Sequence, residues 1–208
     1  MSLSYREEET LNAISHGFGA VLGLVGFVLL LKNNTRHTEY ANFAIITYSL
    51  SLILLFVASA WYHSIAEPSL KKKLRVLDHI SIYYLIAGTY TPVSLITLES
   101  GNGWTIFYVV WGMALVGTLL KLFFTGRFEV FSLLLYLFMG WMIVFDFRNL
   151  TTQLSKEGLW LMGLGGAFYT LGILFYAIRR IPYNHLIWHI FVLGGAISHW
   201  FMIYLHVI

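Results

Sequence analysis

The sequence predicts an all-α membrane protein, a seven-transmembrane helix bundle formed as one domain over residues 1–208. Hydrophobic residues make up 58% of the chain and charged residues only 11%, well below the roughly 25% of a typical soluble domain. The charges fall between long apolar segments, each with about the 20 residues that a helix needs to cross a bilayer core. There is no cysteine, so disulfides and thiolate metal sites are excluded.

The first three spans are bounded by charged or polar connections. Glutamates precede the first span and no small-residue cleavage site ends it, so it does not read as a signal peptide. The second span follows a polar connection and is free of charge. The third contains Pro92, which should kink it. The approximate boundaries of these spans are 12–32, 41–63 and 79–98.

The last four spans follow with equally short connections, which leave no room for a soluble domain. The fifth span is the weakest candidate for a membrane helix because Asp146 interrupts it. We expect the Asp146 carboxylate to pair with Arg148 at the membrane–water interface. Small residues in the first, sixth and seventh spans, among them Gly19, Gly165 and Gly195, predict close helix packing in lipid. The boundaries are 104–121, 130–147, 158–178 and 184–206.

The basic residues predict the orientation of the bundle. Alternating topology places nine Lys and Arg residues on the side of the N-terminus and four on the other. Because cytoplasmic loops carry the excess of positive charge, the N-terminus is predicted to be cytoplasmic and the C-terminus extracytoplasmic. The nine are Arg6, Lys71, Lys72, Lys73, Arg75, Lys121, Arg127, Arg179 and Arg180; the four are Lys32, Arg36, Arg148 and Lys156. The basic residues behind the net charge of +3 are explained by this orientation signal, so the charge does not indicate a nucleic-acid partner.

Ionisable side chains gather at one membrane depth. The same topology places His16, His63, Asp78 with His79, and the pair His185 and His189 towards the cytoplasmic side. His185 and His189 lie four residues apart on one helix face, a spacing at which two imidazoles can reach one metal ion. His63 would complete a set of three, the number of protein ligands in catalytic zinc sites. Zinc is the expected metal, although imidazole also suits copper, iron and nickel.

Two further residues have an expected role beside this metal. Asp78 could hold the water that the metal activates and accept its proton. Ser59 lies four residues before His63, on the same helix face, and its hydroxyl could hydrogen-bond the same water. No Glu is present between His185 and His189, so the HExxH arrangement is absent and Asp78 is the best candidate for the base.

A second interpretation of these histidines needs no metal. Histidines four residues apart arise often by chance, and each could instead form interhelical hydrogen bonds within the bundle. The shared depth of the histidines and Asp78 favours the metal site over this alternative. His199 and His206, in the outer half, are expected to be packing or interface residues.

The chain resembles the bacterial haemolysin III branch of the progestin and adipoQ receptor family, which includes the adiponectin receptors. The matching segments occur in family order along almost the whole chain. They are Glu9-x-x-Asn12-x-x-x-His16-Gly17, Ser59-Ala-Trp-Tyr-His63, Asp78 with Ala87-Gly-Thr-Tyr-Thr-Pro92, and His185-x-x-x-His189. The resemblance implies zinc held by His63, His185 and His189, with Asp78 and Ser59 holding water. It implies no ligand role for His79 and gives no chemical role to Glu9, Asn12 or His16, which we expect to act at the helix start and in interhelical hydrogen bonds.

The resemblance also points to a function. It implies a ceramidase-like hydrolase of a lipid amide or ester, which acts from the cytoplasmic leaflet of a bacterial plasma membrane. Membrane lipids are then the partners, and the oligomeric state is left open. Two alternatives remain: a non-enzymatic regulator of membrane lipids with structural zinc, and a haemolysin-type pore former. A monomeric pore would need a polar stripe across the whole membrane, whereas the polar residues cluster on one side.

Overall fold

A computed structural model describes residues 5–35, 37–178 and 180–208. Arg36 and Arg179, which enter the charge count, lie outside the described residues. The described part of the chain forms helices and contains seven segments long and apolar enough to cross a membrane. The seven-helix fold is therefore confirmed. The elements are α1 (Tyr5–Asn33), α2 (Ala41–Ser64), α3 (Pro68–Pro92), η1 (Val93–Thr97), α4 (Gly103–Phe124), α5 (Glu129–Gly140), η2 (Met142–Asp146), α6 (Phe147–Gln153), α7 (Lys156–Ala177) and α8 (Asn184–His206).

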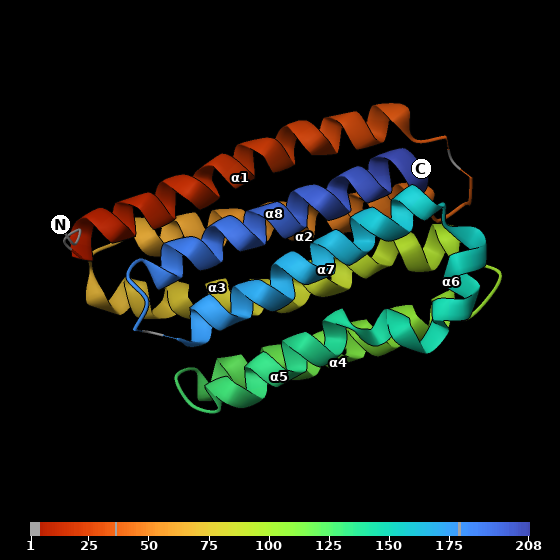
Figure 1. The fold of residues 1–208 in the computed structure, drawn as a ribbon. Helices are drawn as coiled ribbons and strands as arrows, with labels where there is room; N and C mark the ends of the chain where they lie inside the picture. The colour runs from red at the N-terminus through yellow and green to blue at the C-terminus, as the bar shows by residue number, and fades with distance from the viewer. Residues whose placement is uncertain (1–4, 36, 179) are drawn as a thin grey trace.

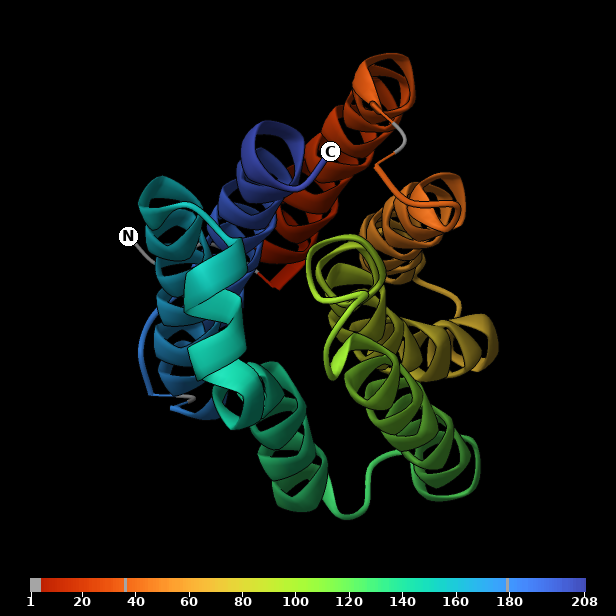
Figure 2. The same ribbon diagram turned by 90° about the vertical axis from the view of Figure 1, so that its right-hand side faces the viewer.

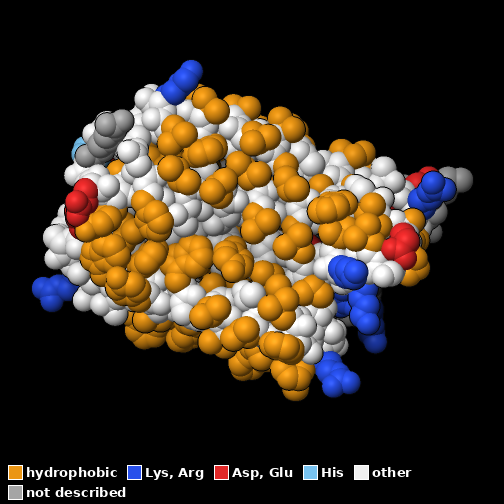
Figure 3. All heavy atoms as spheres, turned by 180° about the vertical axis from the view of Figure 1, so that it is seen from behind, with side chains coloured by type: hydrophobic (Ala, Val, Ile, Leu, Met, Phe, Trp, Pro, Cys, Tyr) orange, Lys and Arg blue, Asp and Glu red, His pale blue; other side chains and the backbone are white. Residues whose placement is uncertain are grey.

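The helices run alternately between two ends of the bundle (Figures 1 and 2). The N-terminal end is where α1, α3, α5 and α8 begin and where α2, α4 and α7 end. The most extensive packing joins α1 to α2, α2 to α3, and α7 to α8, while α5 contacts its neighbours at few positions. Hydrophobic side chains cover the middle of the face shown in Figure 3, and charged side chains lie towards its two ends. This pattern is typical of a membrane-spanning bundle; which end faces the cytoplasm stays a prediction.

The third span begins eleven residues before the predicted boundary. Glu67 caps α3, because its side chain accepts hydrogen bonds from the backbone N–H groups of Ser69 and Leu70 at 2.8 and 2.6 Å. Pro68 follows at the first helical position, where its missing N–H is not needed. The basic residues from Lys71 to Arg75 therefore lie on the helix. A boundary drawn at charged residues misses this part because a helix can continue beyond the apolar core.

Pro92 marks a change of helix type in the third span. The α-helix ends at this residue and continues as the π-helical turn η1, in which the N–H of Leu98 donates to the carbonyl of Val93. Proline lacks an N–H, so a local change of hydrogen-bond pattern at this position is expected.

The fifth span is broken, whereas the sequence predicted one helix over 130–147. α5 ends at Gly140, and the chain continues as the 3₁₀ turn η2 and then α6. The Tyr90 hydroxyl stabilises the break by donating to the Gly140 carbonyl at 2.8 Å and accepting from the Ile143 N–H at 3.0 Å. Backbone groups freed within a membrane need such partners.

Asp146 has different partners from those predicted. Its carboxylate accepts hydrogen bonds from the side-chain amides of Asn102 at 3.0 Å and Asn149 at 3.3 Å. No ion pair joins it to Arg148 among the described residues. Asn102 lies at the start of α4, so tertiary folding supplies a partner from a distant part of the sequence that local spacing cannot reveal.

Candidate metal centre

Three histidines meet at the N-terminal end of the bundle. His63 lies at the end of α2, and His185 and His189 occupy the first two turns of α8. Each offers a ring nitrogen, and these three atoms lie within 4.8 Å of one another. The Nε2 atoms of His63 and His185 are 3.2 Å apart. This is the set that the sequence predicted, and its geometry can hold a metal ion. The identity of the metal stays a prediction.

A carboxylate on α1 orients His63. The Nδ1 atom of His63 lies 3.0 Å from Glu9 Oε1, and Lys71 donates to the other oxygen of the same carboxylate. When Nδ1–H donates to a carboxylate, the opposite nitrogen, Nε2, is left bare and free to bind a metal. Nε2 is the atom that faces His185. Glu9, to which the sequence assigned no chemical role, therefore belongs to the support of the cluster.

The backbone of α1 orients His189 in the same way. His189 Nδ1 lies 3.2 Å from the Asn12 carbonyl oxygen, and Ser15 Oγ is also 3.2 Å away. Donation from Nδ1 to the carbonyl leaves Nε2 of His189 unprotonated. The His16 ring stacks on the His189 ring, with centroids 3.6 Å apart and an interplanar angle of 10°. The first-helix motif thus surrounds two of the three candidate ligands, a placement that only tertiary contacts reveal.

Ser59 and Asp78 lie beside the histidines but outside the group of candidate ligands. Ser59 is buried on α2, one turn before His63, and Asp78 is half-buried on α3. Both residues line the same cavity as His185 and His189, so their position suits the predicted roles.

His79 belongs to a different polar cluster. Its Nδ1 atom lies 4.0 Å from Glu129 Oε2, and Lys121 Nζ is 2.8 Å from the same oxygen. Arg75 lies 3.5 Å from the other carboxylate oxygen. The Glu129 carboxylate thus joins side chains of α3, α4 and α5. His79 lies outside the group of three candidate ligands.

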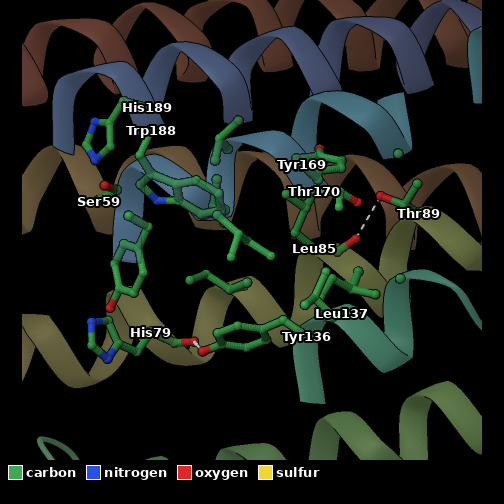
Figure 4. Close-up of a pocket in the computed structure, with 18 of the residues that line it drawn as sticks. Ser59, His79, Leu85, Thr89, Tyr136, Leu137, Tyr169, Thr170, Trp188 and His189 are labelled. Carbon is green, nitrogen blue, oxygen red and sulfur yellow. Dashed lines mark hydrogen bonds between the residues drawn. The ribbon is translucent and has the colours of Figure 1, made fainter. Parts of the chain in front are cut away.

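A largely apolar cavity extends from the histidines along the bundle. Its first part, of about 130 Å³, is lined by His185 and His189 of the cluster and by Ser59 and Asp78. A second part, of about 490 Å³, reaches Lys156 and Trp160 near the opposite end. Figure 4 shows Ser59 and His189 at one end of the first part, with Tyr169 and Thr89 at the other. The two parts adjoin, because six residues line both: Thr89, Tyr90, Gly140, Trp141, Gly166 and His199.

The chain is similar to known proteins over most of its length. The profile of the Haemolysin-III related family matches residues 4–200. Hemolysin-3 of Bacillus cereus is 40% identical over 97% of this chain and 93% of its own, and a Hemolysin-3 homolog of Bacillus subtilis is 40% identical over 95% and 93%. The human monocyte to macrophage differentiation factor is 30% identical over 95% of this chain and 83% of its own. These matches and the seven-helix fold confirm the resemblance that the motifs suggested, and the chain belongs to the haemolysin III family.

Proposed function

We propose that this protein is a zinc-dependent membrane hydrolase that cleaves the amide or ester bond of a lipid. The arrangement of His63, His185 and His189 at the end of a long apolar cavity carries the proposal. Three imidazole donors match the ligand number of catalytic zinc sites. The Nδ1 atoms of His63 and His189 lie within hydrogen-bond distance of acceptor oxygens on α1. Metal-binding histidines usually have such a hydrogen bond at the nitrogen that does not bind the metal. The donor set and its surroundings therefore fit zinc.

A zinc ion at this position would polarise a substrate carbonyl and lower the pKa of a bound water to about 7. Asp78 lies beside the cluster and would accept a proton from the attacking water, and later return it to the leaving group. Ser59 would hold the Asp78 carboxylate and the reacting oxygen in position by hydrogen bonding. The apolar lining beyond them would bind the acyl chain and exclude water from it.

The shape of the bundle supports a lipid substrate. The second part of the cavity is bounded by Trp141, Val144 and Phe147 of the fifth span and by Gly163 and Gly166 of α7. Since α5 and α7 contact each other at few positions, a lipid would enter laterally between them. On this proposal the histidines lie near the cytoplasmic leaflet of a bacterial plasma membrane, the orientation that the charge count predicts.

Metal analysis and a lipid-hydrolysis assay on detergent-purified protein test the proposal. We expect about one zinc per chain in the wild type and a strong loss in His189→Ala. Asp78→Asn should keep the zinc and lose fatty-acid release from a panel of lipid amides and esters. His206→Ala, at the opposite end of the bundle, is the matched control and should behave as the wild type. A zinc-loaded wild type that releases no fatty acid from the panel would overturn the hydrolase proposal.

The same variants distinguish a structural zinc from a catalytic zinc. If zinc only clamps α2 to α8 in a lipid regulator, His189→Ala lowers the thermal stability while Asp78→Asn keeps both zinc and biological activity.

The name Hemolysin-3 of two relatives suggests a pore former. The candidate metal ligands of this chain lie at one end of the bundle rather than along a path across it, which does not favour a monomeric pore. Liposome leakage at a low protein-to-lipid ratio, beside an inert seven-helix protein, tests that alternative.

A further inference from the structure

Two side chains that line the cavity away from the histidine cluster have a buried polar atom without a hydrogen-bond partner among the described residues. Tyr169 of α7 and His199 of α8 line it about midway along the bundle, with ring centroids 5.6 Å apart. The Tyr169 hydroxyl and His199 Nδ1 are buried and have no hydrogen-bond partner among the described residues. A buried polar atom without a partner is energetically unfavourable, because it has lost its hydrogen bonds to water. Such a pair indicates that a ligand group completes the site.

The polar neighbours of this pair already have partners. Thr89 donates to the Leu85 carbonyl at 2.7 Å, as Figure 4 shows. Thr170 accepts from the indole N–H of Trp141 at 3.2 Å, and the Tyr90 hydroxyl bonds both sides of the break in the fifth span. Among the described residues that line the cavity away from the histidine cluster, Tyr169 and His199 are those with a buried side-chain polar atom that lacks a hydrogen-bond partner.

The hydrogen bond of His199 defines what the pair can recognise. His199 Nε2 lies 3.2 Å from the Met162 carbonyl oxygen, so Nε2 carries the proton and donates it. Nδ1 is then a bare acceptor. The Tyr169 hydroxyl can donate or accept. A group that donates to His199 and accepts from Tyr169 would satisfy both, and an alcohol hydroxyl is the simplest such group.

Glycines hold the two rings in place. The Tyr169 ring lies against Gly195 of α8, where an added Cβ would approach ring atoms to 2.8 Å. The His199 ring lies against Gly165 of α7 closely enough that a side chain there would collide with it. Each helix thus provides a glycine for the ring of the other. The site is therefore fixed by helix packing rather than by flexible surface side chains.

We propose that Tyr169 and His199 bind a hydroxyl group in the middle of an acyl chain, and that the preferred ligand is a hydroxylated acyl lipid. This inference rests on the proposed function, because it takes the cavity to hold an acyl chain. His199 lies ten residues after His189 on α8, about 15 Å farther along the helix axis. A carbonyl at the histidine cluster would place the middle of a long acyl chain, rather than its first carbons, beside the pair.

Direct binding to the detergent-purified protein tests this inference without a need for catalysis. The probes are stearic acid, the derivative hydroxylated at mid-chain, and the derivative hydroxylated next to the carboxyl group. Because two hydrogen bonds are gained and the hydroxyl loses its water shell, we expect only the mid-chain derivative to bind more tightly than stearic acid, by about tenfold.

Two variants locate the effect. Tyr169→Phe and His199→Phe should each bring the mid-chain derivative close to the affinity of stearic acid, while stearic acid itself binds as before and shows that the cavity is intact. Tyr136→Phe is the matched control, since the Tyr136 hydroxyl lines the same cavity but already donates to the His79 carbonyl at 2.9 Å. It should keep the tenfold preference.

The outcomes separate this inference from the proposed function. Equal binding of the three acids, or a preference that persists in both Phe variants, overturns the hydroxyl site and leaves the hydrolase proposal standing. If none of the acids binds, the hydroxyl site is overturned, and the fatty-acid release assay decides the hydrolase proposal on its own. A mid-chain preference that depends on Tyr169 and His199, without hydrolysis of any lipid, supports the hydroxyl site and contradicts only the hydrolase.

Discussion

The support of His63 by Glu9 leads to a quantitative prediction about metal affinity. The His63 side chain is 2% exposed and that of Glu9 17%, and the atoms that join them are 3.0 Å apart. A charged hydrogen bond with so little solvent around it is weakly screened. Glu9→Gln keeps the shape of the side chain but removes the negative charge. Loss of a carboxylate that supports a metal-binding histidine weakens metal binding by about 10–100-fold, or about 1.4–2.8 kcal/mol.

Competition with a chelator of known zinc affinity measures this change on detergent-purified protein. Glu8→Gln, one residue earlier on α1, is the matched control and should bind zinc as the wild type does. Because Glu9 also pairs with Lys71, thermal unfolding of each metal-free variant must show that the bundle is still folded. A folded Glu9→Gln protein with unchanged zinc affinity would refute the argument that α1 prepares His63 for a metal.

Three further predictions concern the stability of the fold. Tyr90→Phe leaves the Gly140 carbonyl and the Ile143 N–H without their shared partner, so unfolding should become easier by about 1–3 kcal/mol in thermal or denaturant titration. Gly117→Ala forces a methyl group into the Tyr83 ring and should destabilise the bundle by about 1–3 kcal/mol, whereas Gly112→Ala on the same helix meets open space among the described residues and should not. Hydrogen bonds from two backbone N–H groups lower the pKa of the Glu67 carboxyl. The cap therefore stabilises the protein fully at a pH above the ordinary carboxyl pKa, and this stabilisation is lost as the pH falls through the lowered pKa. The melting temperatures of the wild type and Glu67→Ala should differ at neutral pH and converge in acid.

The candidate ligands could be predicted because two different regularities act on them. His185 and His189 share a helix face through their spacing, and alternating topology brings the end of α2 to the start of α8. Both rules follow from helix geometry and the thickness of the bilayer. The break in the fifth span could not be predicted in this way. It depends on a hydroxyl from Tyr90, about 50 residues earlier in the chain, and the residues from Phe138 to Phe145 continue apolar across the break.

The sequence by itself determined that the chain has seven segments long and apolar enough to cross a membrane and that His63, His185 and His189 lie at one end of the bundle. Hydrophobicity and helix periodicity act locally, so they can be read from consecutive residues. Only the tertiary structure decided that Glu9 and Asn12 hold the rings of His63 and His189, that Asp146 pairs with asparagines, and that Tyr169 and His199 face one cavity. These contacts join helices whose rotation and tilt are set by packing across the whole bundle, and no local pattern records that packing.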